Sequence, residues 1–192
     1  MNATEIIARE DRLCIRKMEE TETDLGQFLI WVTDPETMRF WEGMTVRFDY
    51  TMVEQCYRDH LEEGVMPCFV EWNEKPIGYA QFYLITDAES YEIPQEAWNR
   101  VVHAGETVYG IDMFIGDVSC RDRGIGTRIL KLLCTALFET YRADILMIDP
   151  KVHNARAIAC YRKCGFCDMC VVPQREAQDG ILHDSLILYR RK

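Results

Sequence analysis

The chain has 192 residues, 48% of them hydrophobic, which is enough for one domain of ordinary size with its own core. Its formal net charge is −10, which argues against nucleic acid as a partner and favours a cationic one. An acidic surface that serves only solubility is the alternative that the charge leaves open. No apolar run approaches the roughly 20 residues that cross a bilayer, and the N-terminal stretch is too charged for a signal peptide, so we expect a cytoplasmic protein with no membrane partner.

Apolar periodicity predicts both strands and helices in the first half of the chain. The expected strands are residues 12–18, 68–72 and 77–85, and the expected helices are residues 24–31 and 51–61. Asp34-Pro35 and Gly64 are expected to end the two helices. A polar turn with a proline joins the last two strands into a predicted hairpin.

The second half of the chain alternates between strand and helix patterns. The expected strands are residues 107–116, 143–150, 166–172 and 185–190, and the expected helices are residues 124–141 and 155–164. Asn154 stands where an N-cap is expected and Gly165 where a helix-ending glycine is expected. Residues 86–105 and 174–184 look irregular. With no repeat and no linker, residues 1–192 are predicted to form one α+β domain around a mixed sheet.

Residues 121–128, with the sequence RDRGIGTR, lie between a predicted strand and a long helix. Gly124 and Gly126 allow the backbone to approach an anion, and the N-terminus of a helix favours negative charge. The pattern is neither a Walker loop nor a dinucleotide fingerprint, because no Gly-Lys-Ser/Thr follows and Ile129 stands at the third glycine position. We therefore expect a phosphate-binding loop, with a turn that merely packs the helix on the sheet as the alternative.

A second motif follows this loop, with Asn154, Ala157, Tyr161, Gly165 and Phe166 in the pattern Asn-x-x-Ala-x-x-x-Tyr-x-x-x-Gly-Phe. The two motifs in this order resemble the Gcn5-related N-acetyltransferase (GNAT) family. Five segments narrow the resemblance to the aminoglycoside 6'-N-acetyltransferases: YGIDMFIG, PIGYAQFY, WVTDP at residues 31–35, FWEG at residues 40–43 and the Asp-Pro at residues 149–150. The resemblance implies a central, mostly antiparallel twisted sheet of six or seven strands, splayed between the fourth and fifth and flanked by helices.

The resemblance also implies acetyl-CoA as co-substrate and no metal. The pantetheine arm is expected along the central strand and the pyrophosphate in the glycine loop. The residues implied to contact the cofactor are Met113, Phe114, Ile115, Arg121, Asp122, Arg123, Gly124, Ile125, Gly126, Thr127, Arg128, Asn154, Ala157 and Tyr161. Tyr161 is the expected donor to the departing thiolate, although a packed helix aromatic is the commoner role for such a residue.

Acetyl transfer to an amine needs a neutral nitrogen, so a nearby carboxylate has to take a proton from the ammonium form. Asp112 is the candidate, as base or as ammonium anchor, with a structural salt bridge as the alternative. Asp149 is expected to bind a second ammonium, unless it only begins an Asp-Pro turn. The residues expected to contact the acceptor are Trp31, Trp41, Tyr83, Tyr109, Asp112, Asp149 and Asp184.

These features predict an acetyltransferase, monomeric or homodimeric, that acetylates the 6'-amino group of a cationic aminoglycoside. Another small amine, a polyamine or a protein N-terminus is the alternative acceptor. A metal-binding protein built on the cysteines within residues 160–170 is an alternative of a different class. Cys167 and Cys170 would point to opposite faces of a strand, which favours thiols that pack as small hydrophobes over a shared metal ion.

Overall fold

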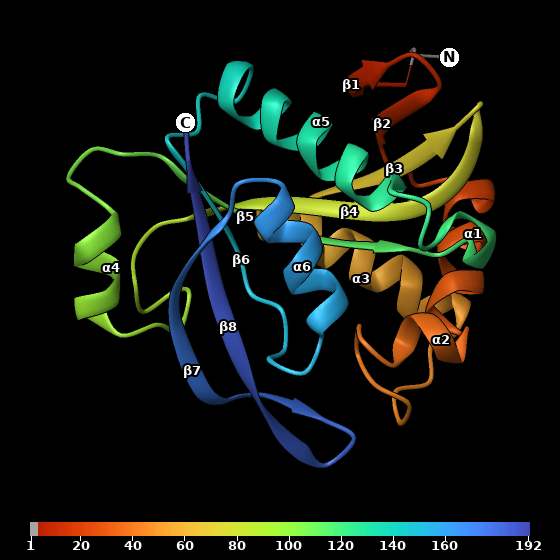
Figure 1. Cartoon of the computed structure of the whole chain (residues 1–192). Helices are drawn as coiled ribbons and strands as arrows, with labels where there is room; N and C mark the ends of the chain where they lie inside the picture. Colours follow the sequence, from red (N-terminus) through yellow and green to blue (C-terminus); the bar gives the residue numbers. More distant parts are fainter. Residues whose placement is uncertain (1–3) are drawn as a thin grey trace.

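The sheet has eight strands in the order β1-β2-β3-β4-β5-β6-β8-β7 (Figure 1). The computed structural model describes residues 4–192. The strands are β1 (Ile6–Glu10), β2 (Leu13–Lys17), β3 (Met66–Trp72), β4 (Lys75–Ile85), β5 (Val108–Ile115), β6 (Ile145–Ile148), β7 (Cys167–Gln178) and β8 (Ile181–Arg191). Among the described strands only β5 and β6 run parallel, so the sheet is mostly antiparallel, as predicted.

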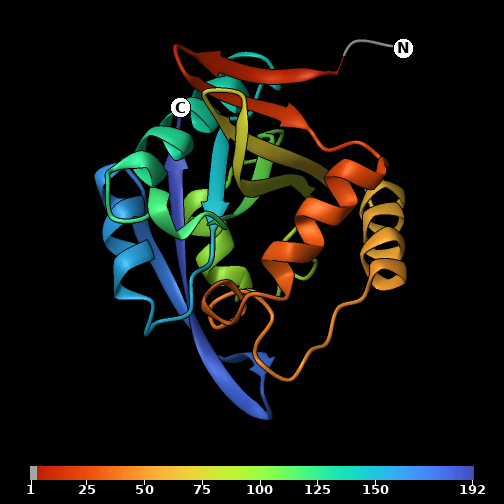
Figure 2. The same cartoon turned by 90° about the vertical axis from the view of Figure 1, so that its right-hand side faces the viewer.

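Helices cover both faces of this sheet. They are α1 (Glu22–Val32), α2 (Pro35–Met38), α3 (Tyr50–Glu62), α4 (Gln95–Val101), α5 (Ile125–Glu139) and α6 (Ala155–Lys163), with a 3-10 turn at Val118–Cys120. Figure 2 shows α5 and α6 on one side of the sheet and α1 and α3 on the other. Helix α4 stands apart from these and packs on β7 (Figure 1).

Side-chain caps decide where several helices begin. Asp49 accepts a hydrogen bond from the Met52 N–H at 2.9 Å, and Asn154 accepts one from the Ala157 N–H at 3.2 Å. The predicted N-cap of α6 is therefore confirmed. Asp34 caps α2 in the same way and Pro35 occupies its first turn, so the predicted break after α1 also starts a new helix.

The two faces of the sheet carry separate cores. On one face α5 buries Ile129, Leu130 and Leu133 completely, because apolar residues at helical spacing share its inner side. On the other face the aromatic side chains of α1 pack on Phe69 and Tyr79 of the sheet. Full burial of each large apolar side chain stabilises the fold by roughly 1.5–3 kcal/mol. These cores hold the central strands rigidly in place.

The central strands separate at one end. β5 and β6 pair only from Val108 to Gly110, opposite Ile145 to Met147. Beyond Gly110, β5 continues to Ile115 with β4 as its partner on one side only. This confirms the predicted splay. The predicted fourth and fifth strands are β5 and β6 of the structure, because β1, which the sequence did not predict, precedes them in the numbering.

The strand number and three segments differ from the prediction. The sheet has eight strands, and not six or seven. Residues 174–184, expected to be irregular, belong largely to the β7–β8 hairpin. Its outer strand, β7, is an edge strand with two shifts of register, so its apolar residues do not alternate cleanly. Helices α2 and α4 are too short for helical periodicity to be visible in sequence.

Candidate active site

A cleft of about 690 Å³ opens where β5 and β6 separate. Its walls come from β5, the first turn of α5, helix α6, the α2–α3 connection and β7. The predicted cofactor residues that line it are Met113, Phe114, Ile115, Arg121, Asp122, Gly124, Gly126, Thr127, Asn154, Ala157 and Tyr161. The predicted acceptor residues that line it are Trp41, Tyr83, Asp112 and Asp149. Two motifs far apart in sequence therefore meet in one cavity.

Two aromatic residues expected on the acceptor side lie outside the cleft lining. Trp31 is 4% exposed and packs edge-to-face on Phe114 in the core beneath α1. Its ring lies so close to Gly116 that a Cβ there would stand 2.3 Å from it. Tyr109 packs against Phe82 on the opposite side of the sheet, below α5. Strand alternation decides this, because Tyr109 and Asp112 are three positions apart and so point to opposite faces.

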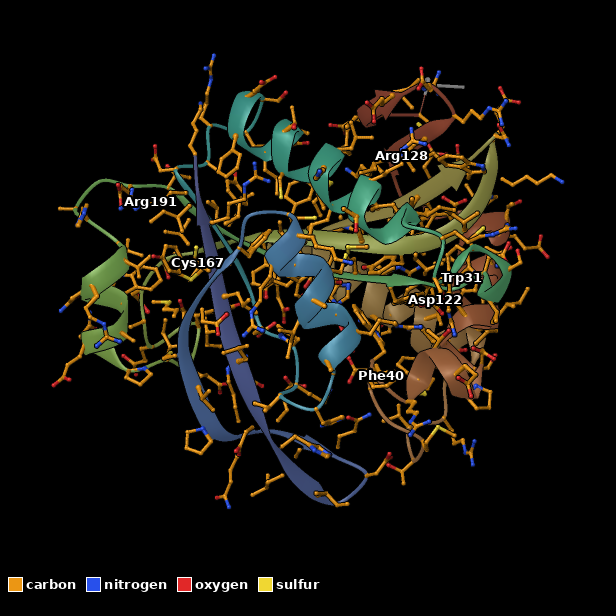
Figure 3. The ribbon with its side chains drawn as sticks, viewed as in Figure 1. Trp31, Phe40, Asp122, Arg128, Cys167 and Arg191 are labelled. Carbon is orange, nitrogen blue, oxygen red and sulfur yellow. The ribbon has the colours of Figure 1, made fainter. Side chains whose placement is uncertain are left out.

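Four further predicted residues are also absent from the lining. Ile125 is buried in the core and Arg123 is exposed. The Arg128 guanidinium lies 4.9 Å from the centre of the Trp72 ring, on the far side of α5 from the cleft (Figure 3). Asp184 accepts a hydrogen bond from the Gln174 N–H at 2.9 Å and so stabilises the β7–β8 hairpin.

The glycine loop presents a helix N-terminus to the cleft. Gly124 adopts a positive φ of 75° and is the N-cap of α5, where it offers no side chain to the free N–H groups of the first turn. The Arg121 guanidinium donates to the Ile115 carbonyl and to the Thr37 hydroxyl, both at 2.9 Å. These bonds pin the loop to the end of β5. The free N–H groups of the first turn of α5, with a fixed positive charge beside them, are the features that favour an anion.

The floor of the cleft carries a hydrogen-bonded carboxylate. Asp112 and Gln81 are direct partners across the β4–β5 ladder, and Gln81 Nε2 donates to Asp112 Oδ2 at 2.9 Å. The buried Tyr79 hydroxyl donates to Gln81 Oε1 at 2.8 Å and so fixes the amide orientation. Burial, and then the neighbouring Asp149, raise the pKa of Asp112 to about 7. A carboxylate with this pKa is suited to accept a proton near neutral pH.

Tyr161 stands on α6 and is 8% exposed, yet it lines the cleft. Burial raises the pKa of Tyr161 well above its ordinary value, and the nearby negative charges of Cys160 and Asp112 act in the same direction. The hydroxyl therefore keeps its proton at neutral pH and can donate it. The sequence motif indicated this residue, and the structure brings it into the same cavity as Asp112.

The β7–β8 hairpin forms the wall opposite the glycine loop. Its tip residue Asp179 accepts hydrogen bonds from the Met44 and Thr45 N–H groups at 2.8 and 2.7 Å. Met44 and Thr45 belong to the α2–α3 connection, which also carries Trp41. The Trp41 ring packs edge-to-face on Phe114 with 4.9 Å between centroids. The hairpin thus holds an aromatic wall over the splayed strands.

Four charged residues in the cleft form two ion pairs. Arg175 Nη1 donates to Asp149 Oδ2, and Lys151 Nζ lies 2.7 Å from Glu176 Oε2. Three of them, Lys151, Arg175 and Glu176, were not predicted. No sequence signal marks the two hairpin residues, since they lie in a stretch that looked irregular. Gln81 was missed although Tyr79, Gln81 and Tyr83 alternate along one strand face, which could have revealed it.

The nine cysteines are all free thiols. Cys160 lines the cleft with Sγ 3.4 Å from Thr127 Oγ1, and Cys164 is buried behind it. Cys167 is exposed and lies on the other side of α6 from Asp122 and Phe40, two residues of the cleft lining (Figure 3). Within residues 4–192 no group of three or more His, Cys, Asp or Glu side chains is arranged to hold a metal ion.

A family model for the GNAT acetyltransferase domain matches residues 20–172. The chain belongs to the GNAT acetyltransferase family. Two aminoglycoside N(6')-acetyltransferases of type 1, from Klebsiella pneumoniae and Serratia marcescens, are each 30% identical over 159 residues, which is 81% of this chain and 74% of theirs. A kanamycin resistance protein of Rhizobium radiobacter is 37% identical over 69 residues, 36% of this chain and 62% of its own.

Solved GNAT structures superpose on nearly the whole chain. The aminoglycoside acetyltransferase AAC(6')-Ib in complex with ribostamycin and coenzyme A gives a TM-score of 0.73 at 27% identity, covering 95% of this chain and 94% of the other. A spermidine N-acetyltransferase of Vibrio cholerae also gives 0.73 over 95% of this chain and 96% of its own, but its 15% identity shows the shared fold alone. No helix within residues 4–192 is long and apolar enough to cross a membrane.

Proposed function

We propose that this GNAT protein transfers the acetyl group of acetyl-CoA to the 6'-amino group of an aminoglycoside. The observation that carries the proposal is the meeting, in one cleft, of the α5 N-terminus with the carboxylate of Asp112. The first is suited to a diphosphate and the second to an amine. The 30% identity to two aminoglycoside N(6')-acetyltransferases supports the choice of acceptor.

The residues present fit acetyl-CoA. The free N–H groups at the start of α5 would hold its pyrophosphate, since Gly126 leaves space there and its added Cβ would meet no atom closer than 3.6 Å. The edge of β5 from Met113 to Ile115 lacks a β6 partner, so its backbone groups can pair with an extended amide chain. When bound, acetyl-CoA supplies a thioester carbon to which the amine nitrogen bonds as the carbon–sulfur bond breaks.

The side chains of the cleft supply the proton transfers. Asp112 holds the acceptor ammonium and takes its proton, directly or through water, so that the nitrogen lone pair is free to attack. The Gln81 amide fixes the orientation of the Asp112 carboxylate. Tyr161, which keeps its proton at neutral pH, donates to the departing sulfur. Trp41 and Tyr83 offer flat walls for sugar rings.

The test presents a panel of acceptors to the protein with acetyl-CoA and measures acetyl transfer as the release of coenzyme A. Kanamycin and tobramycin, which carry a 6'-amino group, are expected to be acetylated, and mass spectrometry with NMR is expected to place the acetyl group on that nitrogen. Spermidine and a peptide with a free N-terminus serve as competing acceptors. If spermidine or the peptide is acetylated and none of the 6'-amino drugs is, the acceptor is not an aminoglycoside. Acetylation of a drug with a 6'-hydroxyl group would shift the site away from the 6' position.

A further inference from the structure

Strand β7 contains an irregularity that points one side chain into the cleft. The pairing register with β8 shifts between Val172 and Glu176, and Gln174 adopts a positive φ of 54°. Asp184 Oδ1 accepts a hydrogen bond from the Gln174 N–H at 2.9 Å and stabilises this bulge. Bulges re-aim side chains. Arg175, the next residue, accordingly lines the cleft instead of pointing to solvent.

Arg175 makes a buried ion pair on the acceptor side. Its side chain is 9% exposed and that of Asp149 is 17% exposed. Besides Asp149, the guanidinium donates to the Tyr91 carbonyl at 3.0 Å and stacks 4.8 Å from the centre of the Tyr91 ring. These contacts fix the guanidinium from three directions. The carboxylate expected to receive an ammonium of the acceptor already has a cation of the protein bound to it.

We propose that Arg175 is a positioning residue for acetyl transfer, which holds and neutralises Asp149 so that Asp112 is the carboxylate left to take the proton of the amine. The proposal rests on the proposed role of Asp112 as base. Arg175 acts through Asp149 and contacts neither of the groups assigned to proton transfer.

Electrostatics explain why such a residue is needed. Two carboxylates in one half-buried site oppose each other's ionisation, and a cation on one of them relieves the other. Asp149 raises the pKa of Asp112 and Arg175 lowers it. The other ionisable or charged groups that interact with Asp112 are four tyrosines and one glutamate: Tyr79 and Tyr83 from β4, Tyr91 from the segment before α4, Tyr161 from α6 and Glu176 from β7. The tyrosines stay neutral, because burial raises the pKa of each.

Glu176 is itself balanced. Its Oε2 lies 2.7 Å from Lys151 Nζ, and its Oε1 accepts a hydrogen bond from the Ser185 hydroxyl at 2.7 Å. Glu176 still raises the pKa of Asp112, but it ranks below Asp149 among the causes. Arg175 is therefore the cation whose removal leaves a second uncompensated carboxylate beside Asp112.

The experiment measures the pKa of Asp112 without any acceptor. Protein labelled with ¹³C at the aspartate carboxyl carbons is titrated by NMR, and the Asp112 signal is the one lost in Asp112→Asn. Arg175→Gln is expected to raise the pKa of Asp112 by about 1, because an opposite charge a few ångströms away shifts a pKa by roughly that much or more. Arg175→Lys keeps the charge and is expected to retain most of the wild-type value.

The double variant Arg175→Gln/Asp149→Asn decides whether the effect passes through Asp149. The double variant is compared with Asp149→Asn alone, and the removal of the arginine is expected to change the pKa of Asp112 less in this background than in the wild type. A rise of equal size in both backgrounds, or an unchanged pKa in Arg175→Gln, would overturn the proposal. If Arg175→Gln does not fold, Arg175→Met in the wild-type and Asp149→Asn backgrounds gives the same decision, since methionine also removes the charge but keeps an unbranched side chain.

Arg58→Gln is the matched control, because Arg58 of α3 pairs at the surface with Glu20, which precedes α1, and with Glu54 of its own helix. It is expected to leave the pKa of Asp112 unchanged. Because the titration needs no acceptor, a failure of the proposed aminoglycoside activity appears in the acceptor panel and not here. The two proposals can therefore fail separately.

Discussion

Gln81 and Asp112 face each other across the β4–β5 ladder and are joined by a 2.9 Å hydrogen bond. β4 pairs with β5 along the whole length of β5 and brings the Gln81 amide to the Asp112 carboxylate. On its other side β5 loses its partner β6 after Gly110, and there the cleft opens. The register of one antiparallel pair thus sets the position of Asp112 and supplies the hydrogen bond that lowers its pKa, against the larger effects of burial and Asp149.

Replacing Asp112 by asparagine tests its role as base. Asp112→Asn is expected to lower kcat/KM by about 10²- to 10⁴-fold, the usual contribution of a general base, while acetyl-CoA binding stays near the wild-type value. Isothermal titration with acetyl-CoA and steady-state kinetics give the two readouts. Asp59→Asn, on the exposed side of α3, is the control and should leave both unchanged. Near-normal turnover of Asp112→Asn would remove Asp112 as base.

The rate should depend on pH through Asp112. Because the pKa of Asp112 is about 7, its base form grows as the pH rises through neutrality, so kcat/KM is expected to rise with a midpoint near pH 7. Gln81 lowers this pKa by donating to the carboxylate. Gln81→Leu should therefore move the midpoint to higher pH, and Tyr79→Phe should move it less, in the same direction. A shift to lower pH in Gln81→Leu contradicts this account.

The same raised pKa predicts an effect on stability. An aspartate with a folded-state pKa of about 7 and an ordinary value of 3.8 binds more protons in the folded state than in the unfolded state between these values. The free energy of unfolding is therefore reduced as the pH rises from about 4 to above 7. Asp112→Asn should remove this loss and raise the melting temperature at pH 8 more than at pH 4. Equal changes at both pH values would show that the carboxylate is not perturbed.

The α5 N-terminus can be tested with a pair of substitutions of equal size. Gly126→Asp places a carboxylate in the first turn, where it competes with the pyrophosphate, and should weaken acetyl-CoA binding about tenfold or more. Gly126→Asn fills the same space without charge and should weaken binding less. The position admits a Cβ, whose nearest atom would lie at 3.6 Å, and the two side chains have the same size beyond it. Equal affinities of the two variants would place the pyrophosphate elsewhere.

Cys160 should be the thiol that coenzyme A protects. A hydrogen bond from Cys164 lowers the pKa of Cys160 to about 6, whereas burial raises the pKa of Cys134 to about 11. Iodoacetamide at pH 7 is expected to label Cys160 before Cys134, and saturating coenzyme A should slow this labelling, since Cys160 lines the cleft. Exposed Cys167 should react equally with and without coenzyme A, which makes it the internal control. Peptide mass spectrometry measures all three.

Much of the cofactor side could be predicted from the sequence because it depends on local backbone geometry. Gly124 at a positive φ, the helix that follows it and the Asn154 N-cap are determined within a few residues of chain. The tyrosine of α6 sits at a fixed helical spacing from that cap. Such short-range features leave a motif in the order of the residues, and the structure brings them together as expected.

The acceptor side was less predictable, because it depends on the pairing of distant strands. Trp31 and Tyr109 were expected to contact the acceptor together with the preferred pair, Trp41 and Tyr83, and the faces of α1 and β5 to which Trp31 and Tyr109 belong place them outside the cleft lining. The burial of an aromatic side chain depends on which helix or strand covers the face from which it projects. The residues next to it in sequence do not indicate this.

By itself the sequence determined the order of the main helices and strands, since this follows from periodicity and capping. Short motifs and the family that they resemble pointed to the candidate anion site at α5 and to the two candidate proton-transfer residues. The tertiary structure alone decided what surrounds Asp112. Gln81 meets it through strand register, and Arg175 reaches Asp149 through a bulge in a hairpin that closes on a loop some 130 residues earlier in the chain. Electrostatic interactions act over distance in space and not along the chain, so the charge state of the cleft appears only once the chain has folded.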